Sequence, residues 1–204
     1  TGSNFKTLAM SESEVCMRDA NGIVQCVNSH IPEMMQNTFI DIDITRSWIC
    51  GITTEGQAIC NDHEYLPWNE IDANGPYTKI AIWYPRSTNS NKRYNLCALG
   101  TNQRLHCWAE DSPYGSPYVA NAVANLTTTQ FTDVGIGQSF GCGLDVDQKI
   151  ICFGANDLGQ TNAPTDSQYT ALSVGTCKSC AIDTEGKMTC WGYTGGGDEG
   201  TYKV

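Results

Sequence analysis

Ten of the eleven cysteines in this chain form pairs with one fixed spacing. Ten positions separate the two members of every pair: Cys16 and Cys26, Cys50 and Cys60, Cys97 and Cys107, Cys142 and Cys152, and Cys180 and Cys190. Cys177 stands outside this pattern. A spacing that recurs along most of the chain indicates an internal repeat, so we expect an array of equivalent structural units.

Each unit opens on an aromatic residue that begins an expected strand. Apolar residues follow it at alternate positions, a period that predicts a β-strand. The aromatic residue stands eleven positions before the first cysteine in four units and twenty before it in the third, which indicates a nine-residue insertion there. The five aromatic residues are Phe5, Phe39, Tyr77, Phe131 and Tyr169.

A short turn lies midway between the paired cysteines. Its third position holds Gly22, Gly56 and Gly186 in three units, as suits a type I turn followed by a bulge, where that residue needs a positive φ. Gln103 and Gln148 fit this turn less well. Two strands folded about such a turn place each first cysteine opposite its partner, which predicts five cross-strand disulfides.

Zinc is the alternative use of so many cysteines. Structural zinc sites usually combine two closely spaced cysteine pairs, whereas the intervals here are long and span a turn between strands. We therefore expect disulfides, and we expect neither a metal nor another cofactor. The next residues on the same face are apolar in four units, and we expect these faces to pack unit on unit; the first unit departs, with Arg18 opposite Val24.

The fourth and fifth units resemble a known repeat. They read Phe131-Thr-Asp-Val-Gly-Ile-Gly137, Cys142-Gly-Leu and Cys152-Phe-Gly, then Gly175, Cys180-Ala-Ile and Cys190-Trp-Gly192. These residues are similar to the repeat of the regulator of chromosome condensation family and its secreted relatives, which include beta-lactamase inhibitor protein II and the extracellular repeats of plant Crinkly receptors. The resemblance implies a β-propeller.

We therefore predict an all-β fold, a five-bladed β-propeller with one disulfide inside each blade. The chain is expected to form a single domain over residues 1–204, with repeats at approximately 5–38, 39–76, 77–130, 131–168 and 169–204. The residues after Cys190 provide a segment that can close the ring.

Charge and composition exclude several classes of partner. The net charge is −10, with 12 Lys and Arg against 22 Asp and Glu, which disfavours nucleic acid and anionic membrane surfaces. Stretches of about 18 apolar residues are absent from the sequence, so membrane insertion is not expected. Disulfides persist in oxidising compartments, which predicts a secreted protein or one on the extracellular side of the cell surface.

The third unit carries two irregularities, and we expect both to lie at one face of the propeller. One is the insertion at residues 83–94, which gathers cationic residues in an acidic chain, and the other is the long connection at 109–130. Long loops on a compact scaffold are often functional, and Tyr, Trp and Arg anchor interfaces. The predicted partner-binding residues are Trp83, Tyr84, Arg86, Lys92, Arg93, Tyr94, Tyr114 and Tyr118. By contrast, Trp108 and Trp191 are expected in the core.

Two further residues stand out. Asn125-Leu-Thr127 is a glycosylation sequon in the second irregular segment, so Asn125 is the expected glycan site in a secreted eukaryotic protein. Cys177 is left as a free thiol on the same face, and it either forms an intermolecular disulfide that links a dimer or stays inert.

These features predict a recognition module that binds a protein partner through loops on one face of the propeller. A carbohydrate-binding lectin is the alternative, although the loop positions of the units share little, which favours one asymmetric site. We expect no enzyme. Five-bladed propellers can carry paired carboxylates as glycosidases do, but the acids here, such as Asp41, Asp43, Asp145 and Asp147, do not single out a pair.

Overall fold

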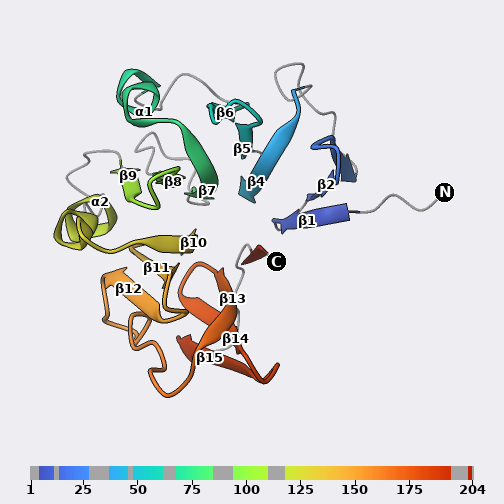
Figure 1. Cartoon of the computed structure of the whole chain (residues 1–204). Helices are drawn as coiled ribbons and strands as arrows, with labels where there is room; N and C mark the ends of the chain where they lie inside the picture. Colours follow the sequence, from blue (N-terminus) through green and yellow to red (C-terminus); the bar gives the residue numbers. More distant parts are fainter. Residues whose placement is uncertain are drawn as a thin grey trace.

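Five antiparallel sheets follow one another about a common axis in the computed structural model (Figure 1). The first strand of each sheet lies closest to this axis (Figure 1). The structure describes residues 5–11, 14–27, 37–45, 48–61, 68–84, 94–109, 118–193 and 202–203. Each sheet consists of three consecutive strands, and the first sheet gains a fourth from the end of the chain.

The strands of the five sheets match the five expected units. Their bounds in the first three sheets are β1 (Phe5–Met10), β2 (Val15–Asp19) and β3 (Val24–Val27); β4 (Phe39–Thr45), β5 (Trp48–Thr53) and β6 (Ala58–Cys60); and β7 (Tyr77–Trp83), β8 (Asn95–Gly100) and β9 (Leu105–Ala109). The last two sheets comprise β10 (Phe131–Ile136), β11 (Phe140–Asp145) and β12 (Ile150–Gly154), then β13 (Tyr169–Val174), β14 (Lys178–Asp183) and β15 (Met188–Gly192).

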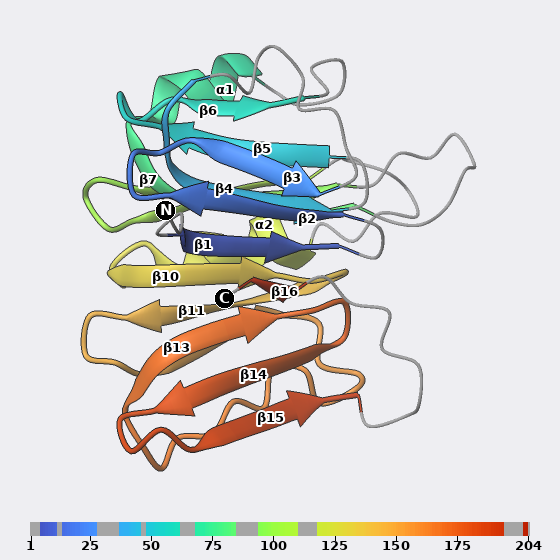
Figure 2. The same ribbon diagram turned by 90° about the vertical axis from the view of Figure 1, so that its right-hand side faces the viewer.

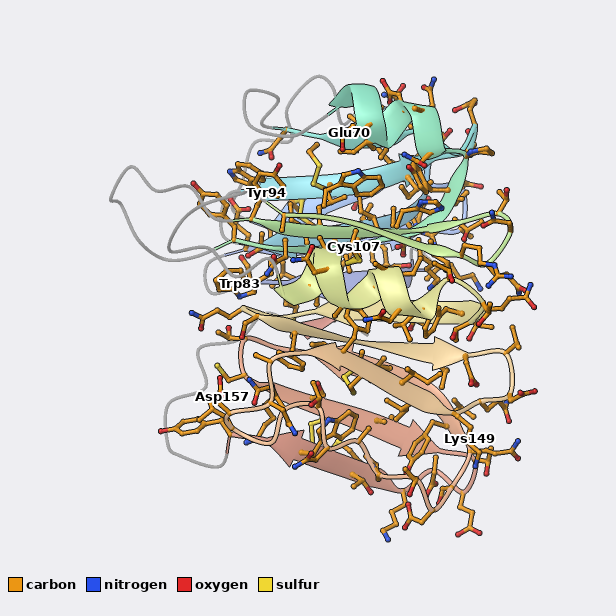
Figure 3. The ribbon with its side chains drawn as sticks, turned by 90° about the vertical axis from the view of Figure 1, so that its left-hand side faces the viewer. Glu70, Trp83, Tyr94, Cys107, Lys149 and Asp157 are labelled. Atoms are coloured by element: carbon orange, nitrogen blue, oxygen red, sulfur yellow. A yellow bond between two sulfur atoms is a disulfide. The ribbon has the colours of Figure 1, made fainter. Side chains whose placement is uncertain are left out.

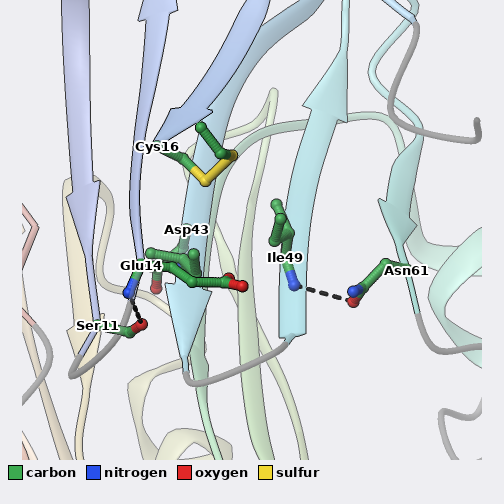
Figure 4. Close-up of a disulfide and its surroundings, with 8 residues drawn as sticks. Ser11, Glu14, Cys16, Asp43, Ile49 and Asn61 are labelled. Atoms are coloured by element: carbon green, nitrogen blue, oxygen red, sulfur yellow. Dashed lines mark hydrogen bonds between the residues drawn. A yellow bond between two sulfur atoms is a disulfide. The ribbon is translucent and has the colours of Figure 1, made fainter. Parts of the chain in front are cut away.

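The register of each sheet places the paired cysteines directly opposite one another on the second and third strands. All five pairs are bonded, with Cα atoms 4.0 to 4.1 Å apart. Figure 4 shows the first of these disulfides, at Cys16, beside the neighbouring sheet. The disulfides tie strands within one sheet, so contacts between sheets come from side-chain packing and from hydrogen bonds.

The turns between the second and third strands share one backbone conformation. Gly22, Gly56 and Gly186 have φ between 82° and 84°, while Gln103 and Gln148 occupy the same position with φ of 63° and 62°. A left-handed conformation costs most residues about 1–2 kcal/mol. The two glutamines therefore adopt the expected turn against their own backbone preference, because the rest of the hairpin fixes it.

Four junctions between successive sheets are packed in the same way. In each, apolar residues of one sheet lie against the first strand of the next, which contributes its leading aromatic residue and two alternate apolar residues. The main-chain N–H of that aromatic residue also donates to the carbonyl of the third turn residue. These bonds are Phe39 to Gly22 (2.8 Å), Tyr77 to Gly56 (2.9 Å), Phe131 to Gln103 (2.9 Å) and Tyr169 to Gln148 (2.8 Å).

The aromatic residue also needs a small neighbour on its own second strand. A Cβ at Gly143 would lie 2.4 Å from the ring of Phe131, and one at Gly51 would lie 2.5 Å from the ring of Phe39. The first sheet has Met17 at this position, where the other four have Gly or Ala. Accordingly, Phe5 remains 38% exposed, whereas the other four leading aromatic residues are at most 2% exposed.

The fifth sheet lacks the cover that the other sheets have. The apolar pairs that face the next sheet are buried at Ile52 and Ala58, Leu99 and Leu105, and Leu144 and Ile150, but Ile182 is 37% and Met188 66% exposed. Figure 2 shows this face of β13, β14 and β15 turned toward the viewer. The expected packing of apolar faces unit on unit thus holds at four junctions and fails at the fifth.

The last strand of the chain does not cover the exposed face of the fifth sheet. Strand β16 (Tyr202–Lys203) pairs with β1, with Ala9 opposite Lys203 and Met10 opposite Tyr202, and it also contacts β13. It lies near the axis, while the outer strands β14 and β15 remain uncovered (Figure 2). Across the described residues, the fifth sheet thus has an open outer face, and closure into the five-bladed ring that the repeat count predicts is not shown.

Two short helices and a 3-10 turn were not expected from the sequence. Helix α1 (Trp68–Asn74) precedes β7, while helix α2 (Tyr118–Val123) and the 3-10 turn η2 (Ala124–Leu126) precede β10. Ile71 of α1 is fully buried, and its carbonyl accepts a hydrogen bond from the Tyr77 hydroxyl at 2.6 Å. Val119 and Val123 of α2 pack with Leu105 and Phe131. Both helices thus add cover to junctions that are already packed.

Candidate interaction surfaces

Two of the predicted partner-binding residues are part of the core. Trp83 is 7% and Tyr94 6% exposed, and both lie in clusters that pack sheet against sheet. Figure 3 shows them at the same end of the third sheet. Both residues end the strands beside the insertion and fill space between sheets, and direct contact with a partner stays a prediction. Trp108 and Trp191 are buried, as expected.

Tyr84 sits at the edge of that core. Its ring stacks on Trp48 of the preceding sheet, with ring centroids 4.6 Å apart. Arg86, Lys92, Arg93 and Tyr114 lie outside the described residues. Tyr118 begins α2, and only its backbone is described. Partner binding by these residues stays a prediction.

Both irregular segments leave the third sheet at one end. Trp83 pairs with Asn95, and Asn95 pairs with Ala109, so the anchors of the two segments form one row across β7, β8 and β9. Asn95 also holds the next sheet, since its Nδ2 donates to the carbonyls of Gly137 (3.1 Å) and Gln138 (2.8 Å). Strand pairing and these hydrogen bonds therefore hold the anchors in place.

Cys177 lies in the turn that joins β13 to β14 and is half-buried. Its carbonyl accepts a hydrogen bond from the Tyr193 amide at 3.0 Å, and its Sγ lies 4.0 Å from Oε1 of Gln138. It is the cysteine without a disulfide. By its place between the first and second strands, it shares an end of the sheets with Trp83 and Tyr94, as the sequence predicts. Asn125, in η2, is exposed.

A cavity of about 300 Å³ lies where the first strands meet the uncovered face of the fifth sheet. Its polar lining includes Asp41, Asp43, Asp133, Lys6 and Lys79. Lys79 forms an ion pair with Asp133 at 3.5 Å. Apolar residues of the fifth sheet complete it, among them Leu172, Ile182 and Met188.

The acidic residues in this cavity join neighbouring sheets. Asp41 Oδ2 accepts a hydrogen bond from the Ile80 amide at 2.9 Å, and Asp43 Oδ2 accepts one from the Ile82 amide at 2.8 Å. At the position equivalent to Asp43, the fifth sheet has Ser173, whose buried Oγ has no hydrogen-bond partner among the described residues. The carboxylates thus stabilise the junction between the second and third sheets.

A second hollow lies over β9, between the end of α1 and helix α2. Its volume is about 380 Å³, and it is lined by Arg104, His106, Trp108 and Thr127, among others. The rings of His106 and Trp108 stack with centroids 6.3 Å apart. Burial lowers the pKa of His106, because desolvation disfavours the charged imidazolium. Arg104 donates to the Thr127 and Thr129 carbonyls, which leaves it less able to bind a ligand.

Within the described residues, no three His, Cys, Asp or Glu side chains are grouped so that they could hold a metal ion. None of the helices in the described part of the chain has the length and apolar character needed to cross a membrane.

Comparison with known proteins shows the fold. The chain is similar to the ectodomain of the receptor kinase CR4 from Physcomitrella patens, with a TM-score of 0.61 at 19% identity, covering 94% of this chain and 51% of that one. It is also similar to the CRINKLY WD40 ectodomain of the Arabidopsis thaliana receptor kinase ACR4, with a TM-score of 0.60 at 16% identity, covering 94% and 66%.

A third similar structure is Prp20p of Saccharomyces cerevisiae, with a TM-score of 0.55 at 10% identity, covering 91% of this chain and 56% of that one. The chain thus spans roughly half to two thirds of the length of these proteins. No protein-family model matches the sequence, and no curated protein matches it significantly. The fold is therefore propeller-like, of the kind found in CRINKLY ectodomains and RCC1 repeat proteins.

Proposed function

We propose that this chain is an extracellular or cell-surface module that recognises another protein. The observation that carries the proposal is the combination of five intrachain disulfides with a fold similar to two receptor kinase ectodomains. Disulfides persist in oxidising compartments. Irregular connections at one end of a sheet scaffold are also a common place for binding residues.

The charge of the molecule supports a protein ligand further. The net charge is −10, so the cationic residues Arg86, Lys92 and Arg93 are a local exception that suits an acidic partner. Two apolar side chains that are paired across the fifth sheet, Ile182 and Met188, are also exposed. Exposed apolar patches commonly mark protein interaction sites.

Capture from native extracellular material tests this proposal. The immobilised chain is incubated with secreted and cell-surface proteins, either untreated, digested with protease, or treated with glycosidases. We expect a saturable ligand that protease removes and glycosidases leave in place. Loss of binding after glycosidase treatment, together with saturable binding on a glycan array, would instead identify a lectin.

The contribution of the cationic insertion is tested separately. Replacing Arg86, Lys92 and Arg93 by Glu should weaken capture without changing the melting temperature. A matched triple change to Gln separates loss of positive charge from reversal of charge. A fall in melting temperature in both variants would show that the insertion is structural.

A further inference from the structure

The uncovered face of the fifth sheet is shaped for a β-strand of a particular pattern. The other four sheets present the equivalent face to a strand that begins with Phe or Tyr and continues with apolar residues three and five positions later. Those strands begin at Phe39, Tyr77, Phe131 and Tyr169. The molecule therefore contains four examples of what covers such a face.

Three groups on the fifth sheet still lack the contacts that these strands supply. Ile182 and Met188 are 37% and 66% exposed, whereas their equivalents on the second, third and fourth sheets are at most 8% exposed. Within the described residues, the Gly186 carbonyl accepts no main-chain hydrogen bond like those that the equivalent carbonyls of the other four turns accept. A Cβ built at Gly186 would meet no atom within 4 Å, while one at Gly56 would lie 2.6 Å from Pro76.

Ser173 is a further polar group on this side of β13. Its Oγ is buried without a partner in the described part of the chain. At the same position of the second sheet, Asp43 accepts a main-chain hydrogen bond from Ile82, a residue of the next first strand. A buried hydroxyl without a partner is unfavourable, so Ser173 leaves a polar group unsatisfied beside this face.

Charge favours a neutral or cationic strand. The cavity beside this face contains Asp41, Asp43 and Asp133 against Lys6 and Lys79, and the whole chain carries a net charge of −10. Among the four internal first strands, Tyr77–Trp83 has the sequence YTKIAIW, which is cationic through Lys79. This sequence therefore supplies both the apolar pattern and a suitable charge.

We propose that the face formed by Ile182, Met188, Gly186 and Ser173 binds a partner protein through an extended strand that begins with an aromatic residue. The aromatic N–H donates to the Gly186 carbonyl, and apolar residues three and five positions later cover Ile182 and Met188. This inference deepens the proposed function and rests on it, since it assigns the kind of partner segment that the module recognises.

Peptides of this chain's own sequence are the probe. A capped, fluorescently labelled peptide of residues 77–83 is titrated with the full chain carrying methyl-¹³C methionine, and fluorescence anisotropy and the Met188 methyl resonance are followed. We expect saturable binding with a shift of the Met188 resonance. The same peptide with Ser in place of Tyr77, Ile80 and Ile82 should bind at least about tenfold more weakly, because it loses most of its apolar surface.

Variants of the chain locate the site. Met188→Lys should weaken binding of the 77–83 peptide by about tenfold or more while leaving the melting temperature near that of the wild type, since the residue is already exposed. Val146→Lys is the matched control: Val146 is 45% exposed on a turn of the fourth sheet, and its replacement should leave binding unchanged.

Several outcomes would overturn the inference. One is a Met188 resonance that the peptide does not shift. The others are a Ser-substituted peptide that binds as tightly as the 77–83 peptide, or a Met188→Lys chain that binds the 77–83 peptide as tightly as the wild type does. Sedimentation showing a dimer that Met188→Lys dissociates would assign the face to a second copy instead. Capture of a partner that Met188→Lys leaves intact would keep the proposed function and refute this face. Peptide binding at Met188 without any captured extracellular protein would support a strand-binding face and refute the proposed function.

Discussion

The fourth and fifth sheets have nearly the same strands, turn and disulfide, yet their surroundings differ. Leu144 and Ile150 on the fourth sheet are 6% and 8% exposed, because β13 covers them. Ile182 and Met188 hold the same positions on the fifth sheet and are 37% and 66% exposed. The repeat therefore determines each sheet, whereas burial of its apolar face depends on a neighbour that only four sheets have.

The largest expected effect comes from the leading aromatic residue of a packed junction. Phe131 is fully buried, and Phe131→Ala should lower the free energy of unfolding by about 3–5 kcal/mol. Phe5 is its equivalent beside the open junction and is 38% exposed, so Phe5→Ala should cost less than about 1 kcal/mol. Urea unfolding of both variants measures the difference. Equal losses would show that the first strand is as well covered as the others.

An intermediate effect is expected from the polar contacts between first strands. Asp43→Ala removes the acceptor of the Ile82 amide, and the free energy of unfolding should fall by about 1–3 kcal/mol. Ser173→Ala removes a hydroxyl without a partner in the described residues, so its effect should stay within about 0.5 kcal/mol. Thermal melts monitored by circular dichroism compare the two. A large loss from Ser173→Ala would mean that its Oγ is already bonded.

Much of each sheet can be predicted from its sequence. The ten-residue cysteine spacing and the alternating apolar residues lead to strands, turns and cysteine register, because these depend on neighbours within one hairpin. The short helices α1 and α2 give no comparable signal, since 7 and 6 residues hold too few turns for a periodic pattern. Trp83 and Tyr94 resemble loop anchors in sequence, yet burial between sheets decides their role.

The open junction has only a weak local signature in the sequence. Whether the ends of five sheets meet depends on the angle between every successive pair, and that angle is set by side-chain volumes at all junctions together. One clue is Met17 in the first unit, which stands where the other four units have Gly or Ala. Arg18 belongs to the packed face instead, and its Nη2 donates to the Thr7 hydroxyl at 3.0 Å, so its charge stays on its own sheet.

A smaller effect, and an increase in stability, is expected at a turn. Gln148 has φ of 62°, a conformation that glycine adopts readily. Gln148→Gly should raise the free energy of unfolding by up to about 1 kcal/mol. Asp147→Gly, one position earlier in the same turn, is the control and should destabilise the protein. Because the turns are alike in all sheets, the gain should be the same whether or not the face of the fifth sheet is occupied by peptide.

The smallest effect is the pH dependence of stability that comes from His106, on the packed third sheet. Burial lowers the pKa of His106, so the folded protein favours the neutral ring. Its contribution is complete above the unfolded pKa of about 6.5 and is lost as pH falls from there toward the lower folded pKa. His106→Gln should therefore lose less stability than the wild type between about pH 7 and pH 5. Urea unfolding at both pH values tests this, and parallel curves would refute it.

Hydroxyl-radical footprinting of the free chain, read by mass spectrometry, tests the open junction most directly. Oxidation rates at Ile182 and Met188 are compared with those at Leu144 and Ile150, in the native and the denatured chain. Met188 should be modified at a rate close to its denatured rate, while Leu144 and Ile150 stay protected. Protection of Met188 and Ile182 equal to that of Leu144 and Ile150, in a monomer, would show instead that the five sheets close on themselves.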